Sequence, residues 1–465
     1  MRRQSRILLI ISCCLLAIAT SRRSFVSAEG SADCAANSSE EKAHTVSGIN
    51  MVGAERTMYV MVLVHGIMGN HKELGYVKQA LEREFVAGTT TEESFLVHSA
   101  TSNDHNTLDG IETGGRRLAE EINELLKGLT QETSPDAPDT VYLSILGNSL
   151  GGLYARYALA HIDWNEPPND QQSPSTADDD NSNRNNSSVS IIPHIFVTTA
   201  TPHLGVRDMT YWKVPQSIQP AGAWYMKKSG SDLFRYTDVI RRLCQDDEFL
   251  RPLSNFTKRI AYANAFSTDA AVPTSTAAFL SDSSSSVHSL VEESSCEERK
   301  KSFLHINSDY PTIRFQTQDS FSNHHRGEGD DVASENKSED DDDDDDDVDS
   351  YSRALDSLGW TKVFVDVRSH IPALWKRERR GDDLNSLATS EEQRQEFSSA
   401  ELKERLSTFD YNTLPFGHSF LVASAKNPIY TWFYSGGRPL VDRIAKELVH
   451  EMTAETLRGN SSGGR

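Results

Sequence analysis

The stretch that decides the fold is VYLSIL at residues 141–146, followed at once by GNSLG at 147–151 and a helical pattern through 162. This order of apolar run, glycine-bounded turn and helix indicates a strand–turn–helix unit. A G-x-S-x-G serine at such a turn is forced into a strained backbone conformation, and side chains at the two glycine positions would clash with neighbouring backbone. Its hydroxyl is then presented at the carboxyl edge of the sheet, at a helix N-terminus. The sequence therefore predicts Ser149 as a nucleophile; the alternative is a close-packed turn without chemistry.

The same alternation of strands and helices continues on both sides of this unit. Further apolar runs typical of buried parallel strands lie at residues 58–64, 195–200, 259–265 and 362–367. Helical periods lie at residues 108–129 and 439–452. The pattern predicts an α/β fold with a mostly parallel central sheet and helices on both faces.

Three polar stretches interrupt the alternation, at residues 165–188, 281–301 and 318–350. They contain too few apolar side chains to offset the entropy lost on ordering, so we predict disordered inserts there. The inserts fall between strand–helix units, which favours a single domain. We expect this domain at 57–458, between a polar linker at 29–56 and a tail at 459–465.

The formal net charge of −21 comes from 47 Lys+Arg and 68 Asp+Glu, and much of it is local. Residues 327–349 hold 14 acids, including the unbroken aspartate run 340–347, against one lysine, which leaves −8 for the rest of the chain. Such a balance excludes general nucleic-acid binding, because nothing would neutralise a phosphate backbone. It also disfavours simple electrostatic docking on anionic membranes, so access to a lipid would rely on apolar contacts near the site.

The N-terminus has the layout of a signal peptide over residues 1–28. Three arginines precede an apolar run at 7–19, and small residues follow at 26–28. An uncleaved membrane anchor is the alternative. We expect a protein of the secretory pathway, in the ER lumen or secreted, with membrane anchoring or onward sorting to an organelle as alternatives. Glycosylation triplets suit this route and begin at Asn37, Asn185, Asn186, Asn255, Asn336 and Asn460.

The five cysteines give no support for metal or redox chemistry. Cys13 and Cys14 lie in the apolar run, and the other three, Cys34, Cys244 and Cys296, have no C-x-x-C spacing. One disulfide with one free thiol is compatible with this count, and the pairing stays open.

A second glycine-bearing turn, HGIMG at residues 65–69, directly follows the strand at 58–64. In an α/β fold with a nucleophile turn, one oxyanion donor comes from such a loop and the other from the residue after the nucleophile. These positions are the backbone N–H groups of Ile67 and Leu150. His65 precedes the turn and is expected to be structural, and His203 is expected to be structural or to line the pocket.

A serine nucleophile needs a base, and the base needs an acid that orients it. In this architecture the chain order is serine, acid, histidine. His418 lies in a turn shortly before the C-terminal helix, and Asp269 follows the strand at 259–265. The rivals that stay open are His370 for the base and Asp238 and Asp366 for the acid.

Several blocks of this sequence occur together in one known family. They are LVHGIMGN, DGIETGGRRLAEEI, LGNSLGGLYARYAL, FVTTATPHLGV, NAFSTDAAVP and GHSFLV. In this order they resemble the putative serine esterase family, lipase-like α/β-hydrolases of plants, fungi and protists. The resemblance covers about residues 57–455 and implies Ser149 as nucleophile, Asp269 as acid and His418 as base. The aspartate run and the serine-rich insert have no counterpart in the family.

The expected function is hydrolysis of carboxylic esters through an acyl-enzyme on Ser149, with no metal or cofactor. The resemblance implies a lipid acyl ester as substrate. We also expect contact with a membrane or lipid-droplet surface, and the oligomeric state stays open. The alternatives are acyl transfer or protein deacylation by the same triad, and a non-catalytic scaffold of hydrolase fold. One apolar cluster is interpreted either as a lid over the site or as core: Trp212, Trp224, Tyr225 and Met226.

Overall fold

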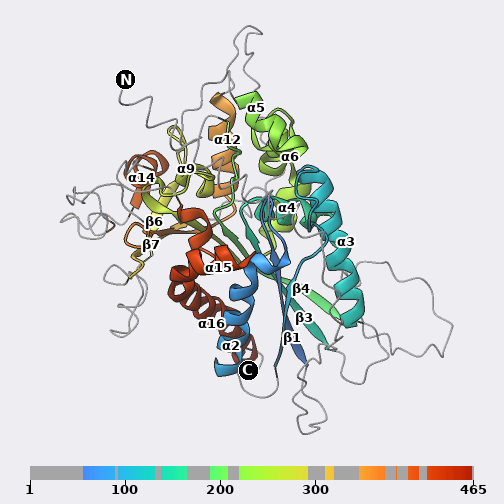
Figure 1. The fold of residues 1–465 in the computed structure, drawn as a ribbon. Coiled ribbons are helices and arrows are strands. Elements are labelled where there is room, and N and C mark those ends of the chain that lie inside the picture. The colour runs from blue at the N-terminus through green and yellow to red at the C-terminus, as the bar shows by residue number, and fades with distance from the viewer. Residues whose placement is uncertain are drawn as a thin grey trace, which may run out of the picture. The chain divides into compact units, whose positions relative to one another are not determined.

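A single mixed sheet forms the centre of the structure (Figure 1). The computed structural model describes residues 56–88, 93–130, 138–164, 189–207, 219–291, 309–318, 345–371, 384, 396–407 and 416–462. Within these ranges nine strands run in the order β2-β1-β3-β4-β5-β8-β7-β6-β9. The first six are parallel, whereas β7, β6 and β9 join them antiparallel. The bounds are β1 Thr57–Val64, β2 Ser94–Ser99, β3 Thr140–Asn148, β4 Ser190–Thr199, β5 Lys258–Asn264, β6 Val287–Leu290, β7 Thr312–Thr317, β8 Thr361–Val365 and β9 Glu396–Ser398.

Helices connect the parallel strands and flank the sheet. The α-helices are α2 Gly75–Gly88, α3 Ile111–Thr130, α4 Leu150–Ala158, α5 Gln219–Tyr225, α6 Lys227–Leu233, α7 Val239–Gln245, α8 Asp247–Ser254, α9 Thr274–Ala277, α12 Asp345–Asp356, α14 Ser399–Leu406, α15 Pro428–Tyr434 and α16 Arg438–Ser462. Short 3-10 turns are η1 His71–Leu74, η2 Leu159–His161, η3 Ala265–Ser267, η4 Gly417–Phe420 and η5 Ser435–Gly437.

The sheet has two buried faces, and β1 shows how the sequence builds both. Its alternate residues Tyr59, Met61 and Leu63 join a core with apolar side chains of α2 and α16. The intervening valines, at 60, 62 and 64, join a second core with α3, α4 and α8. Because both faces are covered, β1 must be apolar throughout, as a buried parallel strand is. Figure 1 shows α2 and α16 together on one side of the strands and α3 on the other.

The predicted α/β fold is confirmed. The expected strands at 58–64, 141–146, 195–200, 259–265 and 362–367 are β1, β3, β4, β5 and β8. The nucleophile turn joins β3 to α4, inside a parallel sheet that helices cover on both faces, which is the α/β-hydrolase architecture.

Two of the predicted inserts contribute regular structure. Val287–Leu290 of the 281–301 stretch forms β6, because it pairs with both β7 and β9. At the end of the 318–350 stretch, α12 begins at Asp345 and buries Val348 and Tyr351 against the core. The expectation of disorder is therefore wrong for these two segments. The stretch 165–188, residues 319–344 and the N-terminal segments 1–28 and 29–55 lie outside the described residues.

No helix within the described ranges combines the length and the apolar character needed to cross a bilayer. Cys244 is buried and free, with no disulfide, whereas Cys34 and Cys296 lie outside the described residues. The final helix, α16, continues to Ser462, into the predicted tail.

Candidate active site

Ser149 stands on a strained turn between β3 and α4, with φ 55° and ψ −126°. A Cβ atom at Gly147 would lie 2.5 Å from the Cα atom of Gly152, and one at Gly151 would lie 2.3 Å from the carbonyl oxygen of Val64. Real Cβ atoms do not approach backbone this closely, so both flanking glycines are required. The strain and the glycine requirement expected from the sequence are therefore both present.

The glycine loop, residues 65–69, packs directly against this turn. A Cβ atom at Gly66 would lie 2.8 Å from the Cβ atom of Ser149. This contact places the loop at the position from which it can reach a carbonyl group attacked by Ser149.

Three N–H groups of the glycine loop have acceptors within the described residues. Gly66 donates to Glu73 (3.3 Å), Met68 donates to the Thr107 hydroxyl (2.8 Å), and Gly69 donates to the Gly66 carbonyl (3.1 Å). Among the described residues, no acceptor faces the N–H of Ile67. Leu150 is the first residue of α4, so its N–H has no acceptor within the helix. Both predicted oxyanion donors, the N–H groups of Ile67 and Leu150, are therefore at positions where the surrounding backbone supplies no acceptor within the described residues.

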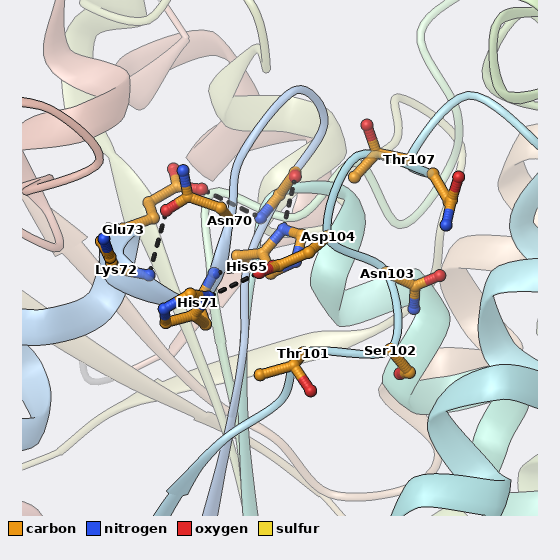
Figure 2. Close-up of polar contacts among 12 residues, drawn as sticks. His65, Asn70, His71, Lys72, Glu73, Thr101, Ser102, Asn103, Asp104 and Thr107 are labelled. Atoms are coloured by element: carbon orange, nitrogen blue, oxygen red, sulfur yellow. Dashed lines mark hydrogen bonds and ion pairs between the residues drawn. The ribbon is translucent and has the colours of Figure 1, made fainter. Parts of the chain in front are cut away.

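The carboxylate of Asp104 contacts both ends of the segment that contains the glycine loop. His65 Nε2 lies 3.1 Å from Asp104 Oδ1, and His71 Nδ1 lies 2.5 Å from Asp104 Oδ2. The backbone N–H of His71 also donates to Asp104 Oδ1 over 2.8 Å. Figure 2 shows both imidazoles converging on this side chain. His65 is buried in this contact, in agreement with a structural role.

Glu73 is a second carboxylate beside the site and, unlike Asp104, it is buried. It lies in η1, and its side chain accepts hydrogen bonds from the Gly66 N–H and from Asn148 Nδ2 (3.2 Å). Its backbone carbonyl accepts from Ala425 N–H over 3.0 Å. Glu73 therefore connects three segments: the glycine loop, the residue before Ser149 and the chain that follows His418.

Asp269 and His418, the acid and the base expected from the sequence, are in direct contact. His418 Nδ1 lies 2.7 Å from Asp269 Oδ2, and the Asp269 side chain is 1% exposed. Asp269 Oδ1 accepts hydrogen bonds from the N–H groups of Ala271 (2.8 Å) and Val272 (3.0 Å). These bonds fix the carboxylate, and the Nδ1 contact leaves Nε2 of His418 for a proton donor.

The surroundings of His418 raise its pKa. Burial acts in the opposite direction and is the largest single influence, since it disfavours the charged imidazolium. The charge and hydrogen bond of Asp269, together with the charge of Glu73, outweigh burial, while Lys426 lowers the pKa slightly. The imidazole is therefore a stronger base than an ordinary histidine.

The structure does not join Ser149 and His418 by a hydrogen bond within the described residues. Catalytic contacts of this kind are commonly long in free enzymes and tighten when substrate binds. The two residues share a neighbour, because Asn148, next to Ser149, bonds to Glu73, whose charge acts on His418.

The rival residues have other partners. His370 stacks on Tyr310 with ring centroids 3.8 Å apart, and Asp366 binds Arg368 over 2.8 and 2.9 Å. Asp238 is exposed and pairs with Arg241, one turn along α7.

His203 is fully buried, away from this chemistry. The Arg156 guanidinium donates toward its Nδ1 (3.2 Å), and its Nε2 lies 3.0 Å from the Thr198 hydroxyl. Burial first, and then the charge of Arg156, hold its pKa well below the ordinary value. A neutral histidine fixed in this way is structural, one of the two roles expected for it.

The apolar cluster after β4 is only partly core. Trp224 in α5 is 82% exposed, so the interpretation as core is wrong for this residue. Tyr225 and Met226 are half-buried, and Trp212 lies outside the described residues. In the described part of the chain, no group of three or more His, Cys, Asp or Glu side chains could hold a metal ion.

Sequence reasoning missed Glu73 and Asp104. Glu73 falls in a 3-10 turn whose start is marked by Asn70, which caps the Lys72 N–H over 3.0 Å. That capping pattern was a signal for a turn, but nothing in the sequence aims the carboxylate at the site. Asp104 lies in a polar loop after β2, and its role exists only through contact with the distant glycine loop.

About half of the chain is similar to known proteins. Residues 54–285 match the family described as Putative serine esterase (DUF676). A putative lipase of Schizosaccharomyces pombe is 28% identical over 234 residues, which cover 48% of this chain and 26% of that protein, so the chain spans about a quarter of this relative's length.

Two solved structures are also similar. Phospholipase PlaB from Legionella pneumophila, in complex with thio-NAD, is 12% identical, with a TM-score of 0.27 over 44% of this chain and 38% of that chain. Bacillus licheniformis lipase BlEst2, in propeptide form, is 16% identical, with a TM-score of 0.24 over 44% and 35%. These scores are too low to bear on function. Through residues 54–285, which hold Ser149, Asp269 and both candidate oxyanion donors, the chain belongs to the putative serine esterase family.

Proposed function

We propose that this protein is a serine hydrolase that cleaves carboxylic esters through an acyl-enzyme on Ser149. The observation that carries the proposal is the strained Ser149 turn against the glycine loop, whose Ile67 N–H is left without an acceptor in the described residues. The pair of Asp269 and His418, 2.7 Å apart, supplies an oriented base.

In the first half of the reaction, Ser149 Oγ attacks the ester carbonyl carbon while His418 Nε2 takes the hydroxyl proton. The carbonyl oxygen becomes an oxyanion and accepts hydrogen bonds from the Ile67 and Leu150 N–H groups. When the tetrahedral intermediate collapses, the bond to the leaving oxygen breaks, and His418 gives its proton to the departing alcohol. Asp269 keeps the Nδ1 proton in place and stabilises the imidazolium.

In the second half, His418 takes a proton from water, and the resulting hydroxide attacks the acyl-enzyme carbonyl. Collapse releases the carboxylic acid and returns the proton to Ser149 Oγ. Each half uses the same two oxyanion donors, and losing one such donor typically costs about 10²–10³ in rate. The raised pKa of His418 suits a base that must accept a proton in both halves.

We infer that the substrate is an acyl ester of a lipid. The curated relative in Schizosaccharomyces pombe is named a putative lipase, and its similarity spans about half of this chain, 48%. Acyl transfer to another alcohol, or removal of acyl chains from proteins, would use the same residues and differ only in the acceptor or the leaving group.

Substitution of the nucleophile tests the proposal. Ser149→Ala should lower turnover of p-nitrophenyl esters by about 10⁴-fold or more, because the acyl-enzyme cannot form. Ser254→Ala, a serine substitution at the end of α8, is the matched control and should leave turnover unchanged. Unchanged turnover in Ser149→Ala would refute the assignment. An unmodified chain without turnover on any ester would favour the scaffold alternative, and product analysis distinguishes hydrolysis from acyl transfer.

A further inference from the structure

The chain places an exposed apolar helix immediately after its candidate base. Asn427 caps the N-terminus of α15 by accepting from the Tyr430 N–H (3.0 Å), and Pro428 occupies the first turn. Both features favour helix formation at this point. The sequence PIYTWFY of α15 is almost wholly apolar or aromatic, yet none of its residues is buried.

Three of these side chains share one face of the helix. Ile429, Trp432 and Phe433 are spaced i, i+3 and i+4, and are 73%, 78% and 37% exposed. Scattered apolar residues on a surface need no explanation, but neighbouring large ones mark an interaction site. We call these three residues the α15 face.

The α15 face is coupled directly to the candidate base. The Phe433 ring packs against Phe416 and Phe420, with centroid distances of 6.0 and 6.4 Å. These two phenylalanines stand two residues before and two residues after His418. Figure 1 shows α15 directly above α16. Any surface that covers the α15 face therefore comes next to the segment that carries His418.

The charges around α15 differ from those of the chain as a whole. From Phe416 to Val441 the sequence contains Lys426 and Arg438 but no acidic residue, in a chain of net charge −21. Lys426 Nζ lies 4.0 Å from the ring centroid of Tyr430, and Arg438, which opens α16, is exposed. Exposed Trp and Ile side chains flanked by cations match the interface of a phospholipid surface, where apolar groups enter below the headgroups and cations meet phosphates.

We propose that the α15 face docks on a phospholipid surface and brings the candidate active site to lipid esters held there. This inference rests on the proposed function, which supplies the reason for a lipid-facing site. Asp442, one turn after Arg438 in α16, is paired with Arg83 (2.9 Å) and accepts from the Tyr76 hydroxyl (2.8 Å), so Lys426 and Arg438 are the charges that remain to meet headgroups. Charges beyond about 10 Å are largely screened at physiological salt.

Vesicle flotation with the full chain carrying Ser149→Ala tests this docking without lipid turnover. The protein should float with vesicles of phosphatidylcholine and phosphatidylglycerol, and more weakly with phosphatidylcholine alone. Adding Ile429→Ser and Trp432→Ser should weaken binding at least about tenfold, because two apolar side chains no longer enter the interface. Val86→Ser is the matched control: Val86 is 81% exposed, but lies in the last turn of α2, and its substitution should leave binding unchanged.

Several results would overturn the proposal. They are no flotation of the parent chain, equal binding by the double variant, and equal weakening by Val86→Ser. Equal binding to both kinds of vesicle would refute the role of the cations. A dimer in sedimentation velocity that the double substitution dissociates would assign the α15 face to a second copy of the chain.

Circular dichroism and a thermal melt establish that the double variant is folded, which is expected since both side chains are exposed. Flotation does not depend on ester cleavage, so failure of docking and failure of the proposed hydrolysis are separate results.

Discussion

At the scale of single residues, two carboxylates act on the same imidazole. Asp269 binds Nδ1 of His418 directly, whereas Glu73 contributes charge and bonds to the glycine loop. The first contact fixes the direction of the ring, and both carboxylates favour its protonated form. Their effects can be separated by substitution.

Glu73→Gln should move the acid limb of the kcat/KM profile to lower pH. The base must be neutral to act, so activity rises as pH passes through the pKa of His418. Glu73 raises that pKa, and the neutral amide removes this influence. The measurement is the pH dependence of kcat/KM on a soluble ester, with Glu82→Gln, exposed on α2, as the control. An acid limb that stays in place or moves to higher pH would show that Glu73 does not tune the base.

Asp269→Asn should lower kcat by about 10³–10⁴ while the protein stays folded, as loss of the orienting acid does in other serine hydrolases. Oδ1 accepts from Ala271 and Val272, so the amide nitrogen of Asn would occupy the position that faces His418 Nδ1. The imidazole would then carry its proton on Nε2 and could not accept one from Ser149. The measurement is kcat on a soluble ester.

Asp366→Asn is the control for this prediction. Asp366, a rival candidate from the sequence, pairs with Arg368, and its substitution should leave kcat within a few-fold. A larger loss for Asp366→Asn than for Asp269→Asn would reverse the assignment of the acid.

At the scale of elements, the glycine loop depends on the polar loop between β2 and α3. Asp104→Ala should lower kcat by about 10²-fold, because the Ile67 N–H would lose its fixed position. Asp109→Ala is the matched control, since Asp109 lies in the same connection but is exposed, and its side chain pairs with Arg117. The measurement is kcat together with a thermal melt, and a folded Asp104→Ala enzyme with full kcat would contradict the positioning role.

The elements that could be predicted from sequence are those with a local signal. β1 and β3 are largely apolar runs, and the G-x-S-x-G pattern of the turn between β3 and α4 predicts glycines that the backbone requires. α2 also carried a signal that was missed, because Val77, Ala80 and Leu81 recur at helical spacing. β6, by contrast, is short and polar, and exists only because two neighbouring strands pair with it.

The residues of the candidate site also differ in whether a local sequence signal identifies them. Ser149, Asp269 and His418 follow strand ends or precede the last helix, so chain order and context identify them. Glu73 and Asp104 could not be identified, since their roles depend on contacts with residues that are distant in sequence or that lie across a turn.

At the scale of the whole molecule, a buried ionic cluster joins α12 to two strands of the sheet, β8 and β6. Lys362 Nζ lies 2.6 Å from Asp356 and 2.9 Å from His288, and all three side chains are almost fully buried. Burial lowers the pKa of Lys362, and the nearby Asp356 opposes this shift. The cluster links α12, β8 and β6, and so fixes the segments on either side of the acidic stretch.

Lys362→Met should reduce the free energy of unfolding by about 3–5 kcal/mol, because Asp356 would be left as an uncompensated buried charge. Lys403→Met removes the exposed pair of Lys403 with Asp282 and should cost at most about 1 kcal/mol. Chemical denaturation of both variants measures the difference. Equal losses of stability would contradict the structural role of the buried cluster.

The acidic stretch that dominates the net charge separates two residues of the candidate site in sequence but not in space. Residues 327–349 lie between Asp269 and His418 in sequence, yet these two side chains meet at 2.7 Å. Their meeting follows from the backbone, because Asp269 and Phe416 form an antiparallel bridge and the Gly417 N–H donates to the Thr268 carbonyl over 2.8 Å. The fold therefore determines which residues are neighbours, and the sequence predicted the fold class without predicting its antiparallel edge.

The central claim is that Ser149 is the nucleophile, and its covalent capture is the most direct test. The full chain is treated with a fluorophosphonate, digested and mapped by mass spectrometry. The account predicts one adduct, on the peptide that contains Ser149, absent from Ser149→Ala and strongly slowed in His418→Ala. An active enzyme that forms no adduct, or forms it on another residue, would contradict it.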